Sequence, residues 1–282
     1  MAYGTVNADT LVTSTSGGVL GAKNASTLQN RLIDAGFTIN QRGYVSGTAL
    51  STGVYAHDRF KAGASGCTYT FTQGSAGVPI VITITAGSLQ QVIEGCNMPE
   101  GGTYVLSWTG TAQARFNGGT YGSSPLSVTG ITAGANTTIE FNTGTVSFPQ
   151  LEVGSSATGF EYRQYQQELA LCQRYCPSYS WVTGGGTNQL IGPASWTASS
   201  TGLTIHVTHP VTTRVPPTGL SFSGTTPYSF TNNNAYALSG INFNAASTAF
   251  TTLSATSTGG ALNAAGFWAI QGGSFYLTGC EL

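Results

Sequence analysis

The chain has 282 residues, a formal net charge of −1 and only 7% charged residues, where roughly 25% is usual for a soluble domain. Hydrophobic residues make up 40%, which is enough for a core and excludes a highly charged disordered tail. Threonine is abundant and glycine numbers 39. Threonine and aromatic residues favour pleated strands, whereas glycine suits turns, so the composition predicts an all-β protein of about two domains.

The charge distribution argues against nucleic acid and membrane as partners. Lys23 and Lys61 are the only lysines, and the arginines are spread along the chain without forming a basic stripe. No apolar run reaches the ~18 residues that cross a bilayer. The N-terminus lacks the basic flank and apolar core of a signal peptide. We therefore expect folding in a cytoplasm, no nucleic-acid binding and no membrane insertion.

The cysteines are odd in number and form no paired CxxC clusters, so we expect buried free thiols. A zinc site built on Cys172 and Cys176 would lack two ligands. His206 and His209 form an H-x-x-H pattern, but residues three apart on a strand point to opposite faces. We predict no metal and no cofactor.

Residues 1–30 are small, polar and weakly periodic. We interpret them as an arm for attachment or oligomerisation that orders against a partner. Within and just after it, Asn24 is a candidate cap for a short helix that carries Leu28 and Leu32 and ends at Gly36.

Residues 31–163 have the pattern of a first β-sandwich. Apolar residues alternate with threonine at 68–72 and 79–86, and the pattern continues at 103–110 and 137–144. Short Gly- and Asn-rich turns separate these strands.

Residues 162–175 are the one segment with a helical period. Tyr165, Leu169, Cys172 and Tyr175 fall near one face, and Pro177 ends the helix. We expect Glu168 at the surface or in a trimer contact. A helix this short must pack its apolar face on something, so we predict a connecting helix at 164–178.

Residues 179–282 return to the β pattern and predict a distal sandwich. Leu203, Ile205 and Val207 alternate inward at 201–211, and 267–271 and 274–282 look like two closing strands. The predicted fold is therefore all-β, with two jelly-roll-like β-sandwich domains joined by a short α-helix and preceded by an N-terminal arm.

The few charged residues favour structural pairing. Gln41, Arg42, Asp58 and Arg59 lie at predicted strand ends and are expected to form an ion pair that pins the first and last strands. Glu152, Glu161 and Arg163 have the same interpretation. In Gln150-Leu151-Glu152, alternation predicts Leu151 inward and the polar pair outward.

Catalysis requires positioned acid–base partners, and the chain has ten Asp and Glu in total. Glu94 and Glu100 flank a turn and are the one close carboxylate pair in the first domain. A glycosidase pair at ~5–10 Å, two solvated loop carboxylates, and a weak Ca²⁺ site remain open for them. The distal domain has Glu281 alone. With no G-x-S-x-G or Cys–His pattern, we predict that the protein is not an enzyme.

Aromatic residues are the candidate ligand-binding groups, because sugars pack apolar C–H faces on rings while amides and arginines bind their hydroxyls. The alternative is that these rings are core residues, since aromatics dominate cores. The candidate glycan platform comprises Trp108, Arg115, Tyr121, Trp181, Trp196, Tyr228 and Tyr236.

Several segments resemble bacteriophage virion proteins, namely tail-fibre, head-fibre and receptor-binding subunits. They are AYGTVNADTLVTSTSGGVLGAKNAS near the N-terminus, NQRG at 40–43, HDRF at 57–60, FPQLEVGSSATGFEYRQYQQELALCQRYC at 148–176 and SFYLTGCEL at 274–282. The resemblance implies a jelly roll like a carbohydrate-binding module, a connecting helix, a variable distal β domain, and assembly as a homotrimer. It implies no enzymatic activity.

Three hypotheses follow for function. The first is a structural fibre protein of the virion that displays a domain for a host-surface glycan and contacts other virion proteins through its N-terminal arm. The second is a capsid-decoration or fibre-anchor protein without a receptor role. The third, a polysaccharide depolymerase, conflicts with the shortage of carboxylates.

Overall fold

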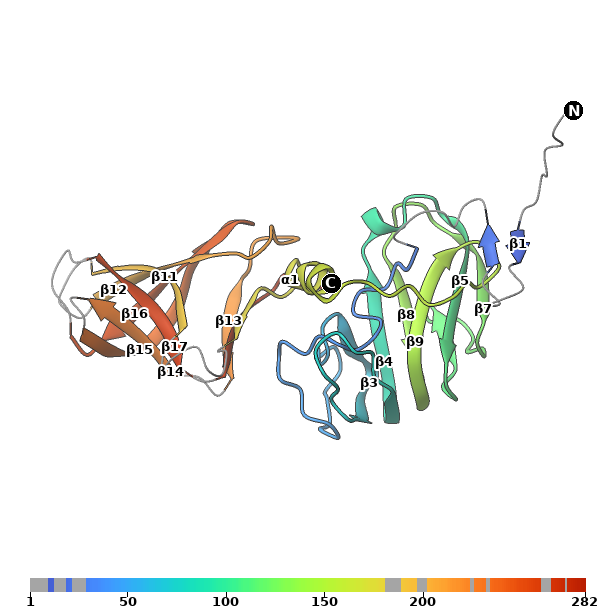
Figure 1. The fold of residues 1–282 in the computed structure, drawn as a ribbon, viewed down its shortest axis with the longest axis horizontal. Coiled ribbons are helices and arrows are strands. Elements are labelled where there is room, and N and C mark those ends of the chain that lie inside the picture. The colour runs from blue at the N-terminus through green and yellow to red at the C-terminus, as the bar shows by residue number, and fades with distance from the viewer. Residues whose placement is uncertain are drawn as a thin grey trace, which may run out of the picture. The chain divides into compact units, whose positions relative to one another are not determined.

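A computed structural model of the chain describes residues 10–12, 19–21, 29–180, 189–196, 202–223, 226–231, 234–259, 265–271 and 273–282. Strands are the main elements of these residues, with one α-helix and one short 3-10 helix among them, so the predicted all-β fold with a helix is confirmed (Figure 1). The chain divides into two compact units. The first unit comprises Met1–Thr38, Val45–Ala56 and Phe60–Tyr165, and the second comprises Ile39–Tyr44, His57–Arg59 and Gln166–Leu282.

The first unit is built on one seven-stranded sheet. Its strands are β3 (Phe60–Phe71), β4 (Ile82–Ile93), β5 (Gly102–Thr109), β6 (Ala114–Phe116), β7 (Leu126–Ile131), β8 (Thr137–Phe141) and β9 (Gly144–Val153). The order is β6-β8-β4-β9-β5-β7, and β3 pairs with β4. Because β9 pairs with β4 at its start and with β5 further along, it joins two groups of strands (Figure 1).

Alternation along these strands separates the core from the surface, as the pattern predicts. Ile82 and Ile84 are buried, whereas the neighbouring Val81 is 54% exposed. Tyr69 is also buried and lies against Phe71, with ring centroids 5.8 Å apart. The two elements that precede the sheet, β1 (Thr10–Val12) and β2 (Val19–Gly21), pair as an antiparallel two-stranded sheet. A 3-10 helix, η1 (Gly95–Asn97), follows β4.

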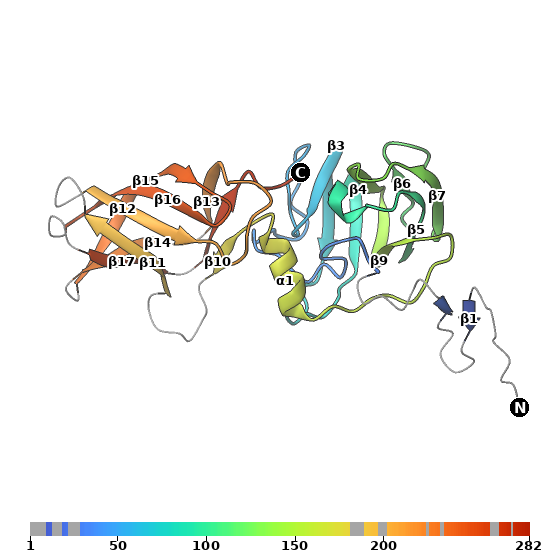
Figure 2. The same ribbon diagram turned by 90° about the horizontal axis from the view of Figure 1, so that it is seen from above.

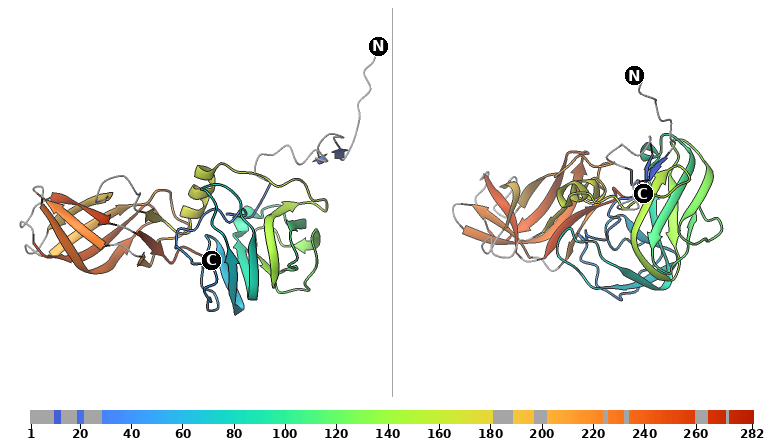
Figure 3. Two further views of the ribbon diagram at one scale, coloured as in Figure 1. Left: turned by 60° about the horizontal axis from the view of Figure 1, so that its bottom comes forward. Right: turned by 45° about the vertical axis from the view of Figure 1, so that its right-hand side comes forward.

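The second unit combines a closed barrel with a small sheet. The barrel strands, in their order of pairing, are β11 (Gln189–Trp196), β12 (Gly202–Thr208), β16 (Phe250–Ser257), β15 (Asn234–Ala246), β14 (Thr226–Thr231) and β17 (Ala265–Gln271). The small sheet consists of β10 (Ser178–Ser180), β18 (Ser274–Thr278) and β13 (Gly219–Ser223) (Figures 2 and 3). The distal strands therefore close into a ring, which alternation along single strands does not reveal.

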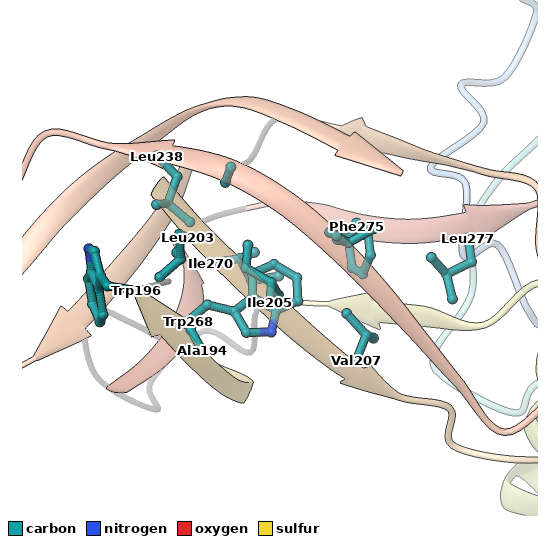
Figure 4. Close-up of a cluster of buried hydrophobic side chains, with 12 residues drawn as sticks. Ala194, Trp196, Leu203, Ile205, Val207, Leu238, Trp268, Ile270, Phe275 and Leu277 are labelled. Carbon is teal, nitrogen blue, oxygen red and sulfur yellow. The ribbon is translucent and has the colours of Figure 1, made fainter. Parts of the chain in front are cut away.

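The core of the second unit runs from the barrel into the small sheet. Leu203, Ile205 and Val207 point inward, as predicted, and Trp268 packs edge to face on Phe275 of β18 (Figure 4). Burial of these aromatic and branched side chains supplies the main stabilising term, roughly 1.5–3 kcal/mol for each large side chain.

The helix is shorter than predicted. α1 spans Tyr165–Gln173 rather than 162–175, and its buried residues are Cys172 and Glu168. The prediction that Glu168 lies at the surface is wrong for this chain, since its side chain is 8% exposed. The residues of the helix from Gln166 onward belong to the second unit.

Two other local predictions need correction. The part of the predicted Asn24–Gly36 helix that is described, 29–36, forms no helix but extended chain that ends in bends and a turn, and Asp34 accepts a hydrogen bond from the Thr38 amide at 2.7 Å. Asn24 and Leu28 lie outside the described residues. Gln150 and Glu152 are buried instead of pointing to solvent.

The burial of Gln150 and Glu152 has a clear cause. The segment after β9 folds back over them, and Thr158 donates to Glu152 while the Glu161 amide donates to Gln150. A strand pattern cannot show that a later loop covers its polar face.

Four of the five cysteines are buried free thiols, as predicted. The exception is Cys96 of η1, which is exposed. None of the described helices has the length and apolar character needed to cross a membrane.

Candidate functional site: a polar row across the first sheet

Four polar side chains occupy directly opposed positions on neighbouring strands of the first unit. Pairing aligns Lys61 of β3 with Gln90 of β4, then Gln90 with Glu140 of β8, and Glu140 with Arg115 of β6. Residues that oppose each other in an antiparallel ladder point to the same face. We call this alignment the polar row.

The opposite face of the same strands is core. Ala62, Leu89, Ile139 and Ala114, each adjacent in sequence to a member of the polar row, are at most 1% exposed. Lys61, Gln90 and Arg115 are half-buried. The polar row is therefore the solvent-facing side of a sheet whose other side is fixed by packing, and a rigid support of this kind favours precise binding.

Glu140 is the electrostatic centre of the polar row. Its side chain is buried and accepts hydrogen bonds from Ser88 Oγ at 2.5 Å and from Arg115 Nε at 2.8 Å. Gln90 and Tyr121 lie near the carboxyl and also favour its charged form. Burial opposes ionisation of Glu140, but these donors outweigh it and hold the pKa of the carboxyl below its ordinary value.

A tyrosine lies at each end of the polar row. The Arg115 guanidinium carbon is 4.5 Å from the centroid of the Tyr121 ring, and Lys61 Nζ is 5.7 Å from the centroid of the Tyr55 ring. Both separations are within the range of cation–π attraction. Burial, together with the adjacent Glu140 carboxylate, raises the pKa of Tyr121 above its ordinary value, so this hydroxyl keeps its proton and can donate.

Gly63 keeps a space open beside Glu140. A Cβ at position 63 would lie 2.0 Å from Ser88 Oγ and 3.1 Å from Glu140 Oε1. A larger residue would therefore displace the serine from the carboxylate. The hydrogen bond between Ser88 and Glu140 therefore requires glycine at position 63 of β3.

The polar row offers hydrogen-bonding groups rather than a proton donor. Glu140 is ionised and saturated with donors, which makes it a poor general acid or base. The row nevertheless presents guanidinium, ammonium, amide and phenol groups beside two aromatic rings. Such a combination suits a ligand with many hydroxyl groups and apolar ring faces.

The structure brings together two of the seven predicted platform residues, Arg115 and Tyr121. Trp108 is only 6% exposed, donates from Nε1 to the Ala112 carbonyl at 2.9 Å, and packs edge to face on Phe141. Trp196 is 1% exposed and lies in the core of the second unit. Neither indole has an exposed face for a sugar, because both rings fill core volume.

The remaining three candidates belong to the distal part. Tyr228 and Tyr236 are half-buried residues on the paired strands β14 and β15, and Tyr236 packs against the core. Trp181 lies outside the described residues.

The second unit contains a separate, closed ionic network. Arg42 contacts Asp58 at 3.0 Å and Glu281 at 2.8 Å, and Arg59 also contacts Glu281. The Arg59 guanidinium carbon lies 3.6 Å from the centroid of the Tyr175 ring. The predicted ion pair among Arg42, Asp58 and Arg59 is thus present, with Glu281 as the carboxylate that the prediction did not include.

This network holds the C-terminal residues to two short segments, 39–44 and 57–59. Arg214 adds hydrogen bonds to the carbonyls of Cys280 and Glu281. Burial raises the pKa of Asp58 to about 6, against the opposing effect of Arg42. Asp58 and Arg59 are at most 1% exposed, so we interpret the network as structural.

The other candidates for chemistry do not assemble a site. Glu100 pairs with Arg31 at 2.7 Å and accepts from the Tyr104 hydroxyl at 3.1 Å. Burial opposes ionisation of Glu100, but its own backbone N–H, Arg31 and Tyr104 hold the pKa of the carboxyl below its ordinary value. His209 is buried against Thr248 and Thr251, whereas His206 is exposed. Within the described ranges, no group of three or more His, Cys, Asp or Glu is placed to hold a metal ion.

Sequence reasoning missed Lys61, Gln90 and Glu140 as partners of Arg115. The signal was present in F-K-A, I-E-F and A-R-F, where one charged residue stands between two apolar ones on a strand. What the sequence lacks is the pairing order, since β8 lies between β4 and β6 in the sheet but follows both in the chain. No protein-family model and no curated protein matches the chain.

Proposed function

We propose that the protein is a non-enzymatic structural protein of a bacteriophage particle and that its first unit binds a saccharide of the host surface through the polar row. The observation that carries the binding role is the row itself, an aligned set of hydrogen-bonding side chains on the half-exposed face of a packed sheet. The virion role is supported by the resemblance of the five segments to fibre and receptor-binding proteins.

The arrangement of groups in the polar row supports saccharide recognition. Hydroxyl groups bind to amides, guanidinium groups and phenols, and tyrosine rings accept the apolar face of a sugar. Gln90, Arg115 and Tyr121 supply these groups from three separate segments, and all three stabilise the charged form of Glu140. A ligand would therefore meet side chains already oriented by their bonds to one another, which lowers the entropy cost of binding.

A depolymerase is less well supported by the geometry. A glycosidase needs one carboxylic acid that donates a proton, usually with a raised pKa. Glu100 and Glu140 both have lowered pKa values and tight donors. The chain therefore has few carboxylates, and the lowered pKa values of these two make them poor proton donors.

The test measures binding of the full-length chain to an array of bacterial surface polysaccharides and to intact host cells. Wild-type protein is expected to bind, and Gln90→Ala and Tyr121→Ala are expected to reduce binding by about tenfold or more, since each removes a group of the polar row. Release of reducing ends should not accompany binding.

The matched control is Tyr228→Ala in the second unit, which removes the same type of ring from a different surface. If Tyr228→Ala abolishes binding and the polar-row variants do not, the distal part carries the receptor role. If the wild-type chain binds no polysaccharide and no host cell, the protein fits a decoration or anchor role instead.

A further inference from the structure

We infer that the polar row recognises an acidic oligosaccharide, one whose sugars carry carboxylate groups, lying across the strands from Lys61 to Arg115. This inference rests on the proposed saccharide-binding function and specifies its ligand class.

The first argument is charge. The polar row has two cations, Lys61 and Arg115, and one carboxylate, Glu140. Ser88 and Arg115 already donate to that carboxylate, and Gln90 and Tyr121 also favour its charged form. The row therefore has a net positive charge in a chain whose formal net charge is −1 and whose charged residues are scarce.

The second argument is the donor capacity of Arg115. A guanidinium has five N–H donors, and Glu140 takes those of Nε and one terminal nitrogen, both at 2.8 Å from Oε2. The other donors remain for a ligand. Charge-assisted hydrogen bonds from arginine to a carboxylate are stronger than those to a neutral hydroxyl, so a uronate gains more here than a neutral sugar.

The third argument is the length of the polar row. Lys61 and Arg115 lie on strands β3 and β6, separated by β4 and β8. Neighbouring strands are about 4.8 Å apart, so three intervals place the two residues roughly 14 Å apart along the sheet. A short linear oligosaccharide that covers this separation would contact both cations. Tyr55 and Tyr121 would then receive its two end sugars.

Lys61 is the residue that distinguishes acidic from neutral ligands. It lies at the end of the row opposite to Arg115, with its ammonium near the Tyr55 ring. A neutral sugar would use the two rings and the Gln90 amide, whereas an acidic sugar also gains from both cations. Substitution of Lys61 should therefore change selectivity more than it changes binding in general.

The experiment measures binding of the full-length chain to a panel of bacterial surface polysaccharides, half of which contain uronic acids and half of which are neutral, together with galacturonate and galactose oligosaccharides of matched length. We expect binding to acidic members, weakening as salt is raised. Affinity should increase with length until the oligosaccharide covers the roughly 14 Å between the two cations.

Two substitutions of Lys61 test the role of its charge, and one substitution of Arg31 is the control. Lys61→Gln is expected to weaken binding of acidic ligands about fivefold, in line with one half-exposed ion pair, and Lys61→Arg should retain it. Arg31→Gln removes one positive charge elsewhere in the first unit, from its pair with Glu100, and should leave binding unchanged.

The outcomes separate this inference from the function on which it rests. Preferential binding of neutral members, reduced by Gln90→Ala but not by Lys61→Gln, would overturn the acidic ligand and retain the saccharide site. Equal loss with Lys61→Gln and Arg31→Gln would also overturn it, because the charge effect would not be local. Absence of binding to every member of the panel would overturn both.

Discussion

The two ionic clusters of this chain differ in what surrounds them. In the second unit, the Arg42–Asp58–Arg59–Glu281 network is nearly closed to solvent, and its arginines hold the C-terminal residues. In the first unit, the polar row has a buried centre at Glu140, but Lys61, Gln90 and Arg115 remain half-exposed. Both clusters stand out in a chain with 7% charged residues.

The difference in burial is the basis for proposing a structural role for one cluster and a binding role for the other. A buried ion pair that loses one partner leaves an uncompensated charge in a low dielectric, which is strongly destabilising. In a half-exposed cluster, groups of a ligand can replace water molecules that are bound to the side chains. The same residue types therefore stabilise the second unit and, in the proposed function, leave the first unit able to contact a ligand.

The largest expected effect is on the closed network. Glu281→Gln removes the carboxylate shared by Arg42 and Arg59 and should reduce the free energy of unfolding by about 3 kcal/mol or more. Denaturant-induced unfolding of the variant and wild type would measure it. A loss similar to that of an exposed pair would show that the network is open to water.

Asp58 predicts a specific pH dependence. Since burial raises its pKa to about 6 from an ordinary value of 3.8, the folded state binds the proton more tightly than the unfolded state. Its contribution to stability is present below pH ~4 and is lost as pH rises through 6. Wild-type melting temperature should fall relative to Asp58→Asn between pH 4 and 7, and a difference that is constant with pH would contradict this.

Glu140 of the polar row should contribute less to stability than Glu281, and its pH dependence should be opposite to that of Asp58. Glu140→Gln should cost about 1–2 kcal/mol, because Arg115 can be solvated when it loses its partner. The pKa of Glu140 is lowered, so its contribution is present above the ordinary value of 4.5 and is lost as pH falls through its folded pKa. Melting curves should therefore show the penalty of Glu140→Gln shrinking below pH 4, and a penalty that grows there would count against the assigned hydrogen bonds.

The smallest effect is expected at an exposed pair. Arg31 and Glu100 are bonded at 2.7 Å, but their side chains are 24% and 45% exposed, so Arg31→Gln should cost less than ~1 kcal/mol. The same unfolding measurement allows this cost to be compared with those of Glu281→Gln and Glu140→Gln. A cost as large as that of Glu281→Gln would remove the contrast between buried and exposed charges.

Local patterns in the sequence predicted much of the fold. The alternation at 201–211 and 79–86 placed inward residues correctly, and the helix at 162–175 was found with its ends displaced. Pairing between distant strands was not predictable, and this pairing creates both the closed barrel and the polar row. Arg115 and Tyr121 were identified individually, but Glu140 was not, because its role depends on neighbours from β4 and β6.

Hydrogen–deuterium exchange with and without bound saccharide tests the central claim most directly. The account predicts added protection at 60–63, 88–92, 114–121 and 137–142, the segments that carry the polar row. Protection confined to the second unit, with these segments unchanged, would contradict it.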